Sequence, residues 1–134
     1  MITINVHKQS NYPVNTAKIK KRIKDTLSSQ GLVSDFEVSV ALVGEQKMDE
    51  LVKKYYHREG PDFGNRPHPI LTFPANEIQE HFINPPDEIA DLGEMVISYP
   101  QAVDRAKEEG RLVQEVIDDL AEHGALHLAG IHNS

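Results

Sequence analysis

Three of the seven histidines of this chain fall within its last twelve residues, as His123, His127 and His132. The first two are four residues apart, so on a helix their imidazole rings project from the same face, one turn apart. Two imidazoles in this arrangement can bind one divalent ion, and a catalytic zinc site adds a third protein ligand and leaves a position for water. An isolated histidine pair on a surface helix is usually only solvated, but a third histidine nearby favours a metal site.

The segment after these histidines is predicted to bring the third one back. The apolar spacing predicts a long helix from Arg111 to Ala129, and Gly130 can end it in the left-handed conformation that reverses the chain direction. We therefore expect His123, His127 and His132 to share one ion. The chain has no cysteine, so any zinc site must use histidine and carboxylate ligands.

The residue after the first histidine distinguishes between two kinds of metal chemistry. In zinc peptidases with the H-E-x-x-H pattern, a glutamate follows the first histidine and acts as the general base. Here that position is Gly124, and Glu122 points about 100° away around the helix. A peptidase mechanism therefore lacks its base.

The elements that must position these residues can be read from the hydrophobic periodicity. Strands are predicted at 2–6, 35–44, 70–73 and 94–99, and helices at 15–30, 45–57, 100–110 and 111–129. Irregular connections are predicted at 57–69 and 74–92, the second with a helical turn near 77–81. The order β-α-β-α-β-β-α-α predicts one α+β domain over residues 1–134, with a mixed sheet of about four strands and four to five helices in layers.

Composition restricts the class of protein. The chain begins without the basic and apolar stretches of a signal peptide and contains no apolar run long enough to cross a membrane, so we expect a cytoplasmic protein with no membrane partner. The formal net charge of −7 argues against a general nucleic-acid coating protein. The basic segment KIKKRIK, residues 18–24, can contact RNA or acidic ribosomal-protein surfaces, or can be a solvated helix face.

Three segments resemble one known family. HGALHLAG, residues 123–130, resembles the H-G-x-L-H-L-x-G signature of the YbeY family, the metal-dependent endoribonucleases of bacterial rRNA maturation. LGEMVIS, residues 92–98, is similar to the family's L-G-D-I-V-I-S strand, and ILTFP, residues 70–74, to its V-L-S-F-P strand. The resemblance covers most of the chain from about Leu51 onward.

The chain also departs from the family pattern. The family usually continues G-Y-D-H, with its third ligand ten residues after the first, where this chain has Asn133 and where the nearest histidine comes one residue early. A Thr-Asp pair before the third strand is replaced by His68-Pro69, and the loop before it is longer.

The resemblance implies a zinc-dependent, single-strand-specific endoribonuclease acting in rRNA processing, maturation and ribosome quality control. Its partners would be single-stranded RNA or rRNA precursors, with ribosomal proteins as further candidates. It implies one Zn²⁺, or another divalent ion, held by three histidines, and a catalytic arginine, for which Arg58 is the first candidate and Arg66 the second. Asn133, or a residue after Ser134 in a longer chain, is the alternative third ligand, and Glu94 is a candidate to orient a ligand ring.

The chemistry of such a site follows from its charges. A metal held by neutral ligands keeps its full charge, lowers the pKa of a bound water and stabilises a developing phosphoryl oxygen anion. A guanidinium can hold phosphate oxygens in a bidentate manner. Two alternatives remain open: another metal-dependent hydrolase, such as a peptidase, and a non-catalytic RNA- or ribosome-binding protein whose metal site is structural or decayed.

Overall fold

The computed structural model describes residues 2–32, 35–56, 69–75 and 90–133. Its element order is the predicted β-α-β-α-β-β-α-α. The bounds are β1 Ile2–Lys8, α1 Thr16–Ser29, β2 Phe36–Val43, α2 Glu45–Tyr56, β3 Ile70–Pro74, β4 Ala90–Ser98, α3 Tyr99–Glu109 and α4 Val113–Asn133.

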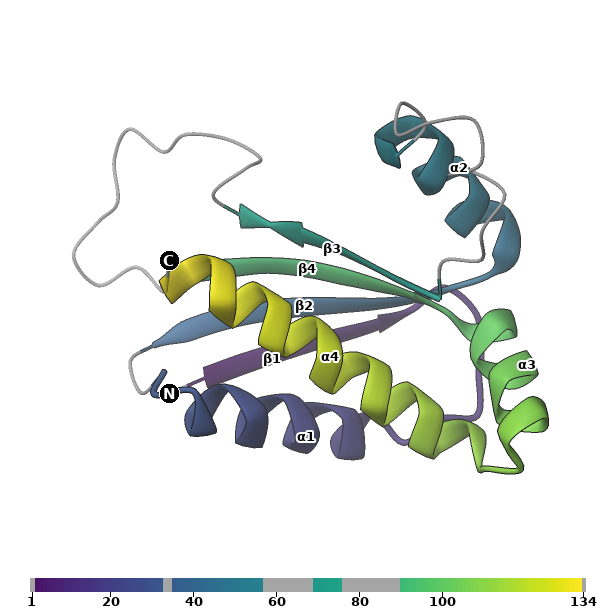
Figure 1. Cartoon of the computed structure of the whole chain (residues 1–134), viewed down its shortest axis with the longest axis horizontal. Helices are drawn as coiled ribbons and strands as arrows, with labels where there is room; N and C mark the ends of the chain where they lie inside the picture. The colour runs from purple at the N-terminus through teal and green to yellow at the C-terminus, as the bar shows by residue number, and fades with distance from the viewer. Residues whose placement is uncertain (1, 33–34, 57–68, 76–89, 134) are drawn as a thin grey trace.

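The four strands form one mixed sheet in the order β1-β2-β4-β3. β1 pairs parallel with β2, β2 pairs parallel with β4, and β3 pairs antiparallel with β4 at the edge of the sheet. Four described helices pack around this sheet, which confirms the predicted α+β class (Figure 1).

The helices lie on both faces of the sheet. α1 and α4 run side by side across one face, and α2 lies on the other side near β3 and β4 (Figure 1). The larger core lies under α1 and α4, where the apolar stripe of α1 (Ile19, Ile23 and Leu27) is fully buried. A smaller core under α2 contains Met48, Val52, Leu71 and Val96. The helix that carries the histidines is therefore fixed against the principal core.

β4 begins at Ala90, four residues before the predicted start of this strand, so the prediction of irregular chain up to Leu92 was wrong at its end. The register between β2 and β4 shifts at this point, and Gly93 has a positive φ of 129°. A Cβ on Gly93 would lie 2.4 Å from the carbonyl oxygen of Phe73. The glycine therefore allows a bulge within the strand.

The predicted stop at Gly130 was also wrong. Gly130 has no positive φ, and α4 continues through Asn133. Glycine is compatible with both the helical and the left-handed conformation, and the helical one adds further backbone hydrogen bonds within α4. The backbone therefore does not reverse before His132.

Two predicted segments fall largely outside the described residues. These are the connections 57–69 and 74–92, including the expected turn near 77–81. Among the helices that the structure describes, none has the length and apolar character needed to span a membrane.

Candidate metal centre

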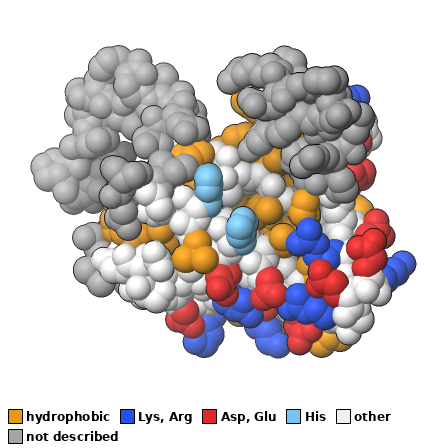
Figure 2. Space-filling view, in the orientation of Figure 1, with side chains coloured by type: hydrophobic (Ala, Val, Ile, Leu, Met, Phe, Trp, Pro, Cys, Tyr) orange, Lys and Arg blue, Asp and Glu red, His pale blue; other side chains and the backbone are white. Residues whose placement is uncertain are grey.

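His123 and His127 both lie on the exposed surface of α4. The sheet-facing side of the same helix is apolar, and Ile117, Ala121 and Ala125 are completely buried there. Figure 2 shows two histidine side chains close together on the molecular face over α4. The amphipathic pattern of α4 therefore places both imidazoles on one accessible surface, as the four-residue spacing predicted.

Gly124 brings this part of α4 close to the sheet. A Cβ at this position would lie 2.9 Å from Cδ1 of Ile70 and 3.0 Å from Sδ of Met95. The absence of a side chain thus allows the helix to pack directly on β3 and β4. A glutamate at position 124 would be directed into this contact, which gives a structural reason why the peptidase pattern does not fit here.

A concave site, here called the α3–α4 cavity, borders His123. Its volume is about 370 Å³, and it lies between the start of β3, α3 and the first half of α4. Its lining residues are Pro69, Ile70, Arg105, Glu109, Arg111, Val116, Asp119, Leu120 and His123. Val116, Leu120, His123 and His127 follow each other at steps of four and three, so they form one stripe along α4.

Sequence reasoning missed the two arginines of this cavity. Arg105 lies on α3 and Arg111 in the turn between α3 and α4, and both resemble ordinary exposed helix residues in the sequence. No local signal identifies them, because only the packing of α3 beside α4 brings them to His123.

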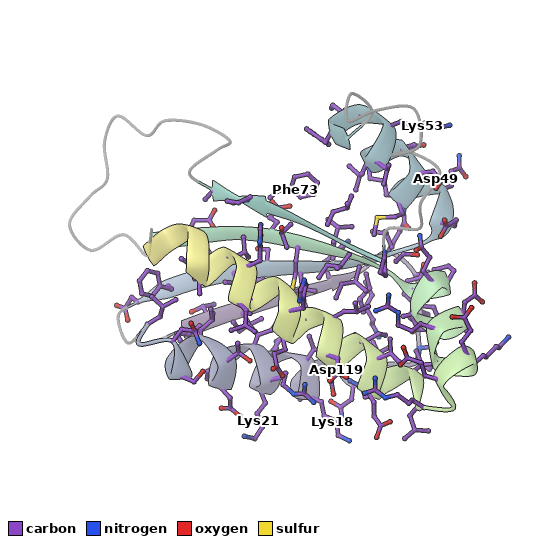
Figure 3. The ribbon with its side chains drawn as sticks, viewed as in Figure 1. Lys18, Lys21, Asp49, Lys53, Phe73 and Asp119 are labelled. Atoms are coloured by element: carbon purple, nitrogen blue, oxygen red, sulfur yellow. The ribbon has the colours of Figure 1, made fainter. Side chains whose placement is uncertain are left out.

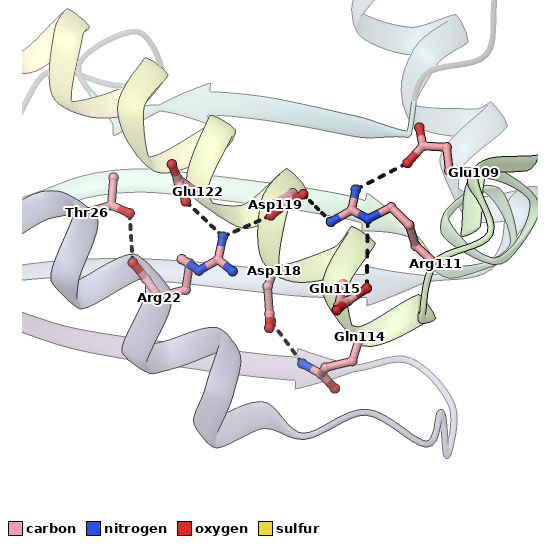
Figure 4. A network of polar contacts seen from close by, with 9 residues as sticks. All are labelled: Arg22, Thr26, Glu109, Arg111, Gln114, Glu115, Asp118, Asp119 and Glu122. Atoms are coloured by element: carbon pink, nitrogen blue, oxygen red, sulfur yellow. Dashed lines mark hydrogen bonds and ion pairs between the residues drawn. The ribbon is translucent and has the colours of Figure 1, made fainter. Parts of the chain in front are cut away.

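A connected set of ion pairs joins α4 to α1 and to the turn before α4, and three of its members, Glu109, Arg111 and Asp119, also line the α3–α4 cavity (Figure 4). Arg22 of α1 contacts Asp119 at 3.0 Å and Glu122 at 2.8 Å, and Asp119 also accepts a hydrogen bond from Arg111. Arg111 contacts Glu109 at 3.2 Å as well. Hydrogen bonding from Arg111 is the principal reason that the pKa of Asp119 is lowered, and bonding from Arg22 adds to it.

The preceding residue on α4, Asp118, has a pKa shifted in the opposite direction. Asp118 is only 7% exposed, and its burial raises the pKa of its carboxyl group. A hydrogen bond of 2.9 Å from Gln114 acts against this shift. Neighbouring carboxylates on one helix therefore differ because one has two guanidinium partners and the other is buried.

The basic segment 18–24 is partly used within the molecule. Arg22 is bound to α4, and Lys21 pairs with Asp25 at 2.9 Å. Figure 3 shows Lys18 and Lys21 projecting from α1 away from the sheet, whereas Asp119 lies between α1 and α4. The described contacts fit a mostly solvated helix face.

The other predicted site residues are not brought to the histidines by the described part of the chain. Arg58 and Arg66 lie outside the described residues. The backbone of His132 and Asn133 belongs to α4, but their side chains are outside the described set. Among the side chains that the structure describes, no three His, Cys, Asp or Glu residues are grouped so that they could hold a metal ion.

Glu94 lies on the other face of the sheet. Its neighbour Met95 faces Gly124 of α4, so the alternation of β4 directs Glu94 toward α2. There it borders a cavity of about 620 Å³ together with Lys47 and Phe73. Figure 3 shows Phe73 on β3, the edge strand of the sheet. The structure therefore does not bring Glu94 to His123 and His127.

The comparisons with known proteins agree with this architecture. Residues 4–133 match the family described as endoribonuclease YbeY. The chain belongs to the YbeY family. It is 33% identical to endoribonuclease YbeY of Dehalococcoides mccartyi over 124 residues, covering 87% of this chain and 74% of that protein. It is 34% identical to endoribonuclease YbeY of Caldicellulosiruptor saccharolyticus, covering 92% of this chain and 79% of the relative.

A solved structure shares the fold of this YbeY family member. A Thermotoga maritima protein determined in solution superimposes with a TM-score of 0.57, over 95% of this chain and 72% of that one. At 21% identity, this similarity concerns the fold alone.

Proposed function

We propose that the protein is a zinc-dependent endoribonuclease that cleaves single-stranded RNA, with rRNA precursors as its substrate. The observation that carries this proposal is the accessible His123–His127 pair on α4, beside a cavity whose lining includes Arg105 and Arg111, in a chain of the YbeY family. The relatives named above are described as endoribonucleases. A role in rRNA maturation and ribosome quality control, in the cytoplasm and in contact with ribosomal proteins, is the corresponding biological proposal.

The donor set of the site fits zinc. Imidazole nitrogens are preferred zinc ligands, and a catalytic site uses three protein ligands. His123 and His127 would supply two of them, and His132 is the proposed third, with Asn133 as the alternative. A bound zinc ion would supply positive charge that stabilises the negative charge developing on a phosphoryl oxygen.

The helical course of residues 130–133 sets a condition on this proposal. Positions 123 and 132 are nine residues apart, which in a regular helix puts their Cα atoms on opposite sides of the axis. A shared ion therefore requires the backbone after Ala129 to leave the helical path. Gly130 is the residue of this segment that can adopt the necessary left-handed conformation without steric cost. We thus propose that metal binding unwinds the last turn of α4.

Each residue of the site would have its own task. His123 and His127 would hold the metal on the rigid part of α4, whose buried side is packed in the core. Gly124 would keep that part of the helix against β3 and β4. Arg58, or Arg66 in its place, would hold phosphate oxygens through its planar guanidinium. The peptidase alternative gains no support, because Gly124 occupies the position of its base.

The test is an RNA cleavage assay on the purified protein. We expect cleavage of a single-stranded oligonucleotide, no cleavage of the matching duplex, and loss of activity with a chelator that added zinc reverses. His127→Ala should reduce the rate more than a hundredfold, because loss of a ligand exceeds the 10- to 100-fold effects seen for outer-shell partners. His7→Ala, which removes an exposed imidazole from β1, is the matched control and should leave the rate unchanged.

The outcomes separate the alternatives. Cleavage that persists in chelator would refute a metal-dependent mechanism. Zinc and RNA binding without cleavage would instead support a non-catalytic RNA-binding protein. His132→Ala and Asn133→Ala, compared for zinc affinity, would identify the third ligand.

A further inference from the structure

The α3–α4 cavity contains one arginine that forms no ion pair with a described carboxylate, although Glu109 and Asp119 line the same cavity. Arg111 is engaged by Glu109 at 3.2 Å, by Glu115 at 3.8 Å and by Asp119. Arg105 is exposed, borders the same cavity, and makes no hydrogen bond or ion pair with another described residue. The two guanidiniums are therefore not equivalent: one is part of the fold, and the other is available to a ligand.

The position of Arg105 relates it to the candidate metal centre. The α3–α4 cavity ends at His123, and the α4 stripe that lines it continues to His127 one turn further. A ligand in the cavity would thus be continuous with one at the two histidines. A single-stranded nucleic acid has this extended form, with a phosphate at each nucleotide.

We propose that Arg105 binds a phosphate group of the RNA strand in the α3–α4 cavity, at a nucleotide next to the cleaved linkage. This inference rests on the RNA substrate of the proposed function. A guanidinium suits this task because its planar set of donors can contact two phosphate oxygens together. Arg111, with its carboxylate partners, would hold the turn between α3 and α4 so that Arg105 faces the cavity.

Binding measurements without cleavage test this contact directly. The affinity of a fluorescent single-stranded RNA would be measured by anisotropy in chelator, over a series of salt concentrations. We expect Arg105→Gln to weaken binding about tenfold, as expected for a lost charge-assisted hydrogen bond. The slope of log K against log salt, which is negative, should become less steep by about 0.7, the value for one phosphate contact on a single strand.

Two further variants make the interpretation specific. Lys107→Gln removes an exposed charge from the same helix outside the cavity lining and should change neither quantity. Arg105→Lys should keep the salt slope but lose part of the affinity, because lysine cannot contact two oxygens in a bidentate manner. Far-UV circular dichroism and the unfolding midpoint would establish that each variant is folded.

Neutral methylphosphonate linkages, placed one at a time along the RNA, would locate the contact. One linkage beside the cleavage position should weaken binding of the unaltered protein but not of Arg105→Gln. Equal behaviour of Arg105→Gln and Lys107→Gln in a protein that binds and cleaves RNA would overturn this inference alone. If the unaltered protein neither binds nor cleaves RNA, the proposed function and this inference both fail.

Discussion

The two long edges of α4 differ in how many of their polar side chains have hydrogen-bond or ion-pair partners within the protein. On the edge toward α1, Glu122 is bound by Arg22, and Asp118 is bonded to Gln114. Asp119 lies where the two edges meet, because it is bound by Arg22 of α1 and by Arg111 of the α3–α4 cavity. On the edge toward α3 and β3, His123 and His127 are exposed beside a cavity that Arg105 of α3 also borders. The first edge uses its charges to hold helices together, whereas the second leaves its groups available to ligands. This difference separates the part of α4 that stabilises the fold from the part we assign to function.

The largest expected effect is on the contact that seats the histidine edge on the sheet. Gly124→Glu would place a carboxylate against Ile70 and Met95. We therefore expect the free energy of unfolding, measured in urea, to decrease by at least about 3 kcal/mol. Gly124→Ala should decrease the free energy of unfolding by about 1 kcal/mol, since the atoms that its Cβ meets are the ends of flexible side chains. An unchanged free energy of unfolding in Gly124→Glu would contradict the described packing.

The second prediction concerns the end of α4. A Cβ on Gly130 meets no described atom within 4 Å, so Gly130→Ala fits the helical form. Alanine favours the helix over glycine by about 1 kcal/mol and disfavours the left-handed conformation by about 1–2 kcal/mol. We therefore expect a metal-free protein about 1 kcal/mol more stable and a zinc affinity ten- to hundredfold weaker. Zinc titration calorimetry measures this, and an unchanged affinity would show that the helix end need not unwind.

A smaller effect on the free energy of unfolding is expected from the ion pairs of Asp119. Asp119→Asn removes the negative charge shared by Arg22 and Arg111. Because these side chains are about a third to a half exposed, solvent screening should limit the loss at pH 7 to about 1 kcal/mol or less, and salt should reduce it further. The folded-state pKa of Asp119 is lowered, so its stabilising contribution is present above the unfolded pKa and is lost as pH falls through the folded value. Equal losses at pH 7 and at strongly acidic pH would be inconsistent with this charge effect.

The adjacent carboxylate should give the smallest change, with the opposite sign. Burial raises the pKa of Asp118, so its preference for the neutral form stabilises the protein below the unfolded pKa and is lost as pH rises through the folded value. Asp118→Asn keeps an oxygen that accepts the bond from Gln114 but carries no charge. We expect a slight gain in the free energy of unfolding at pH 7 that disappears in acid. Urea unfolding at a series of pH values measures this change. A loss at pH 7 would mean that the charge of Asp118 favours the fold.

Most of the fold could be predicted because its signals are local. The alternation of β2 and the apolar stripe of α1 each identify an element and its buried side, and the structure confirms both. The two largest boundary errors occur at Gly93 and Gly130, because a glycine permits a break without requiring one. In one case β4 continues through a bulge, and in the other α4 continues as helix.

The candidate site divides in the same way. The accessibility of His123 and His127 follows from their spacing and from the apolar side of α4, so the sequence sufficed. The position of Arg105 depends on how α3 packs beside α4, which no local pattern contains. Glu94 could not be assigned to a face in advance, since β4 is apolar on both sides and its direction depends on pairing with its neighbours.

X-ray absorption at the zinc edge of the reconstituted protein tests the central claim most directly. The proposed site predicts one ion bound by three imidazole nitrogens at about 2.0–2.1 Å, with an oxygen ligand completing the shell. His123→Ala and His127→Ala should each remove that signal, and His7→Ala should leave it intact. A spectrum without imidazole ligands, or one unaffected by both α4 substitutions, would contradict the account.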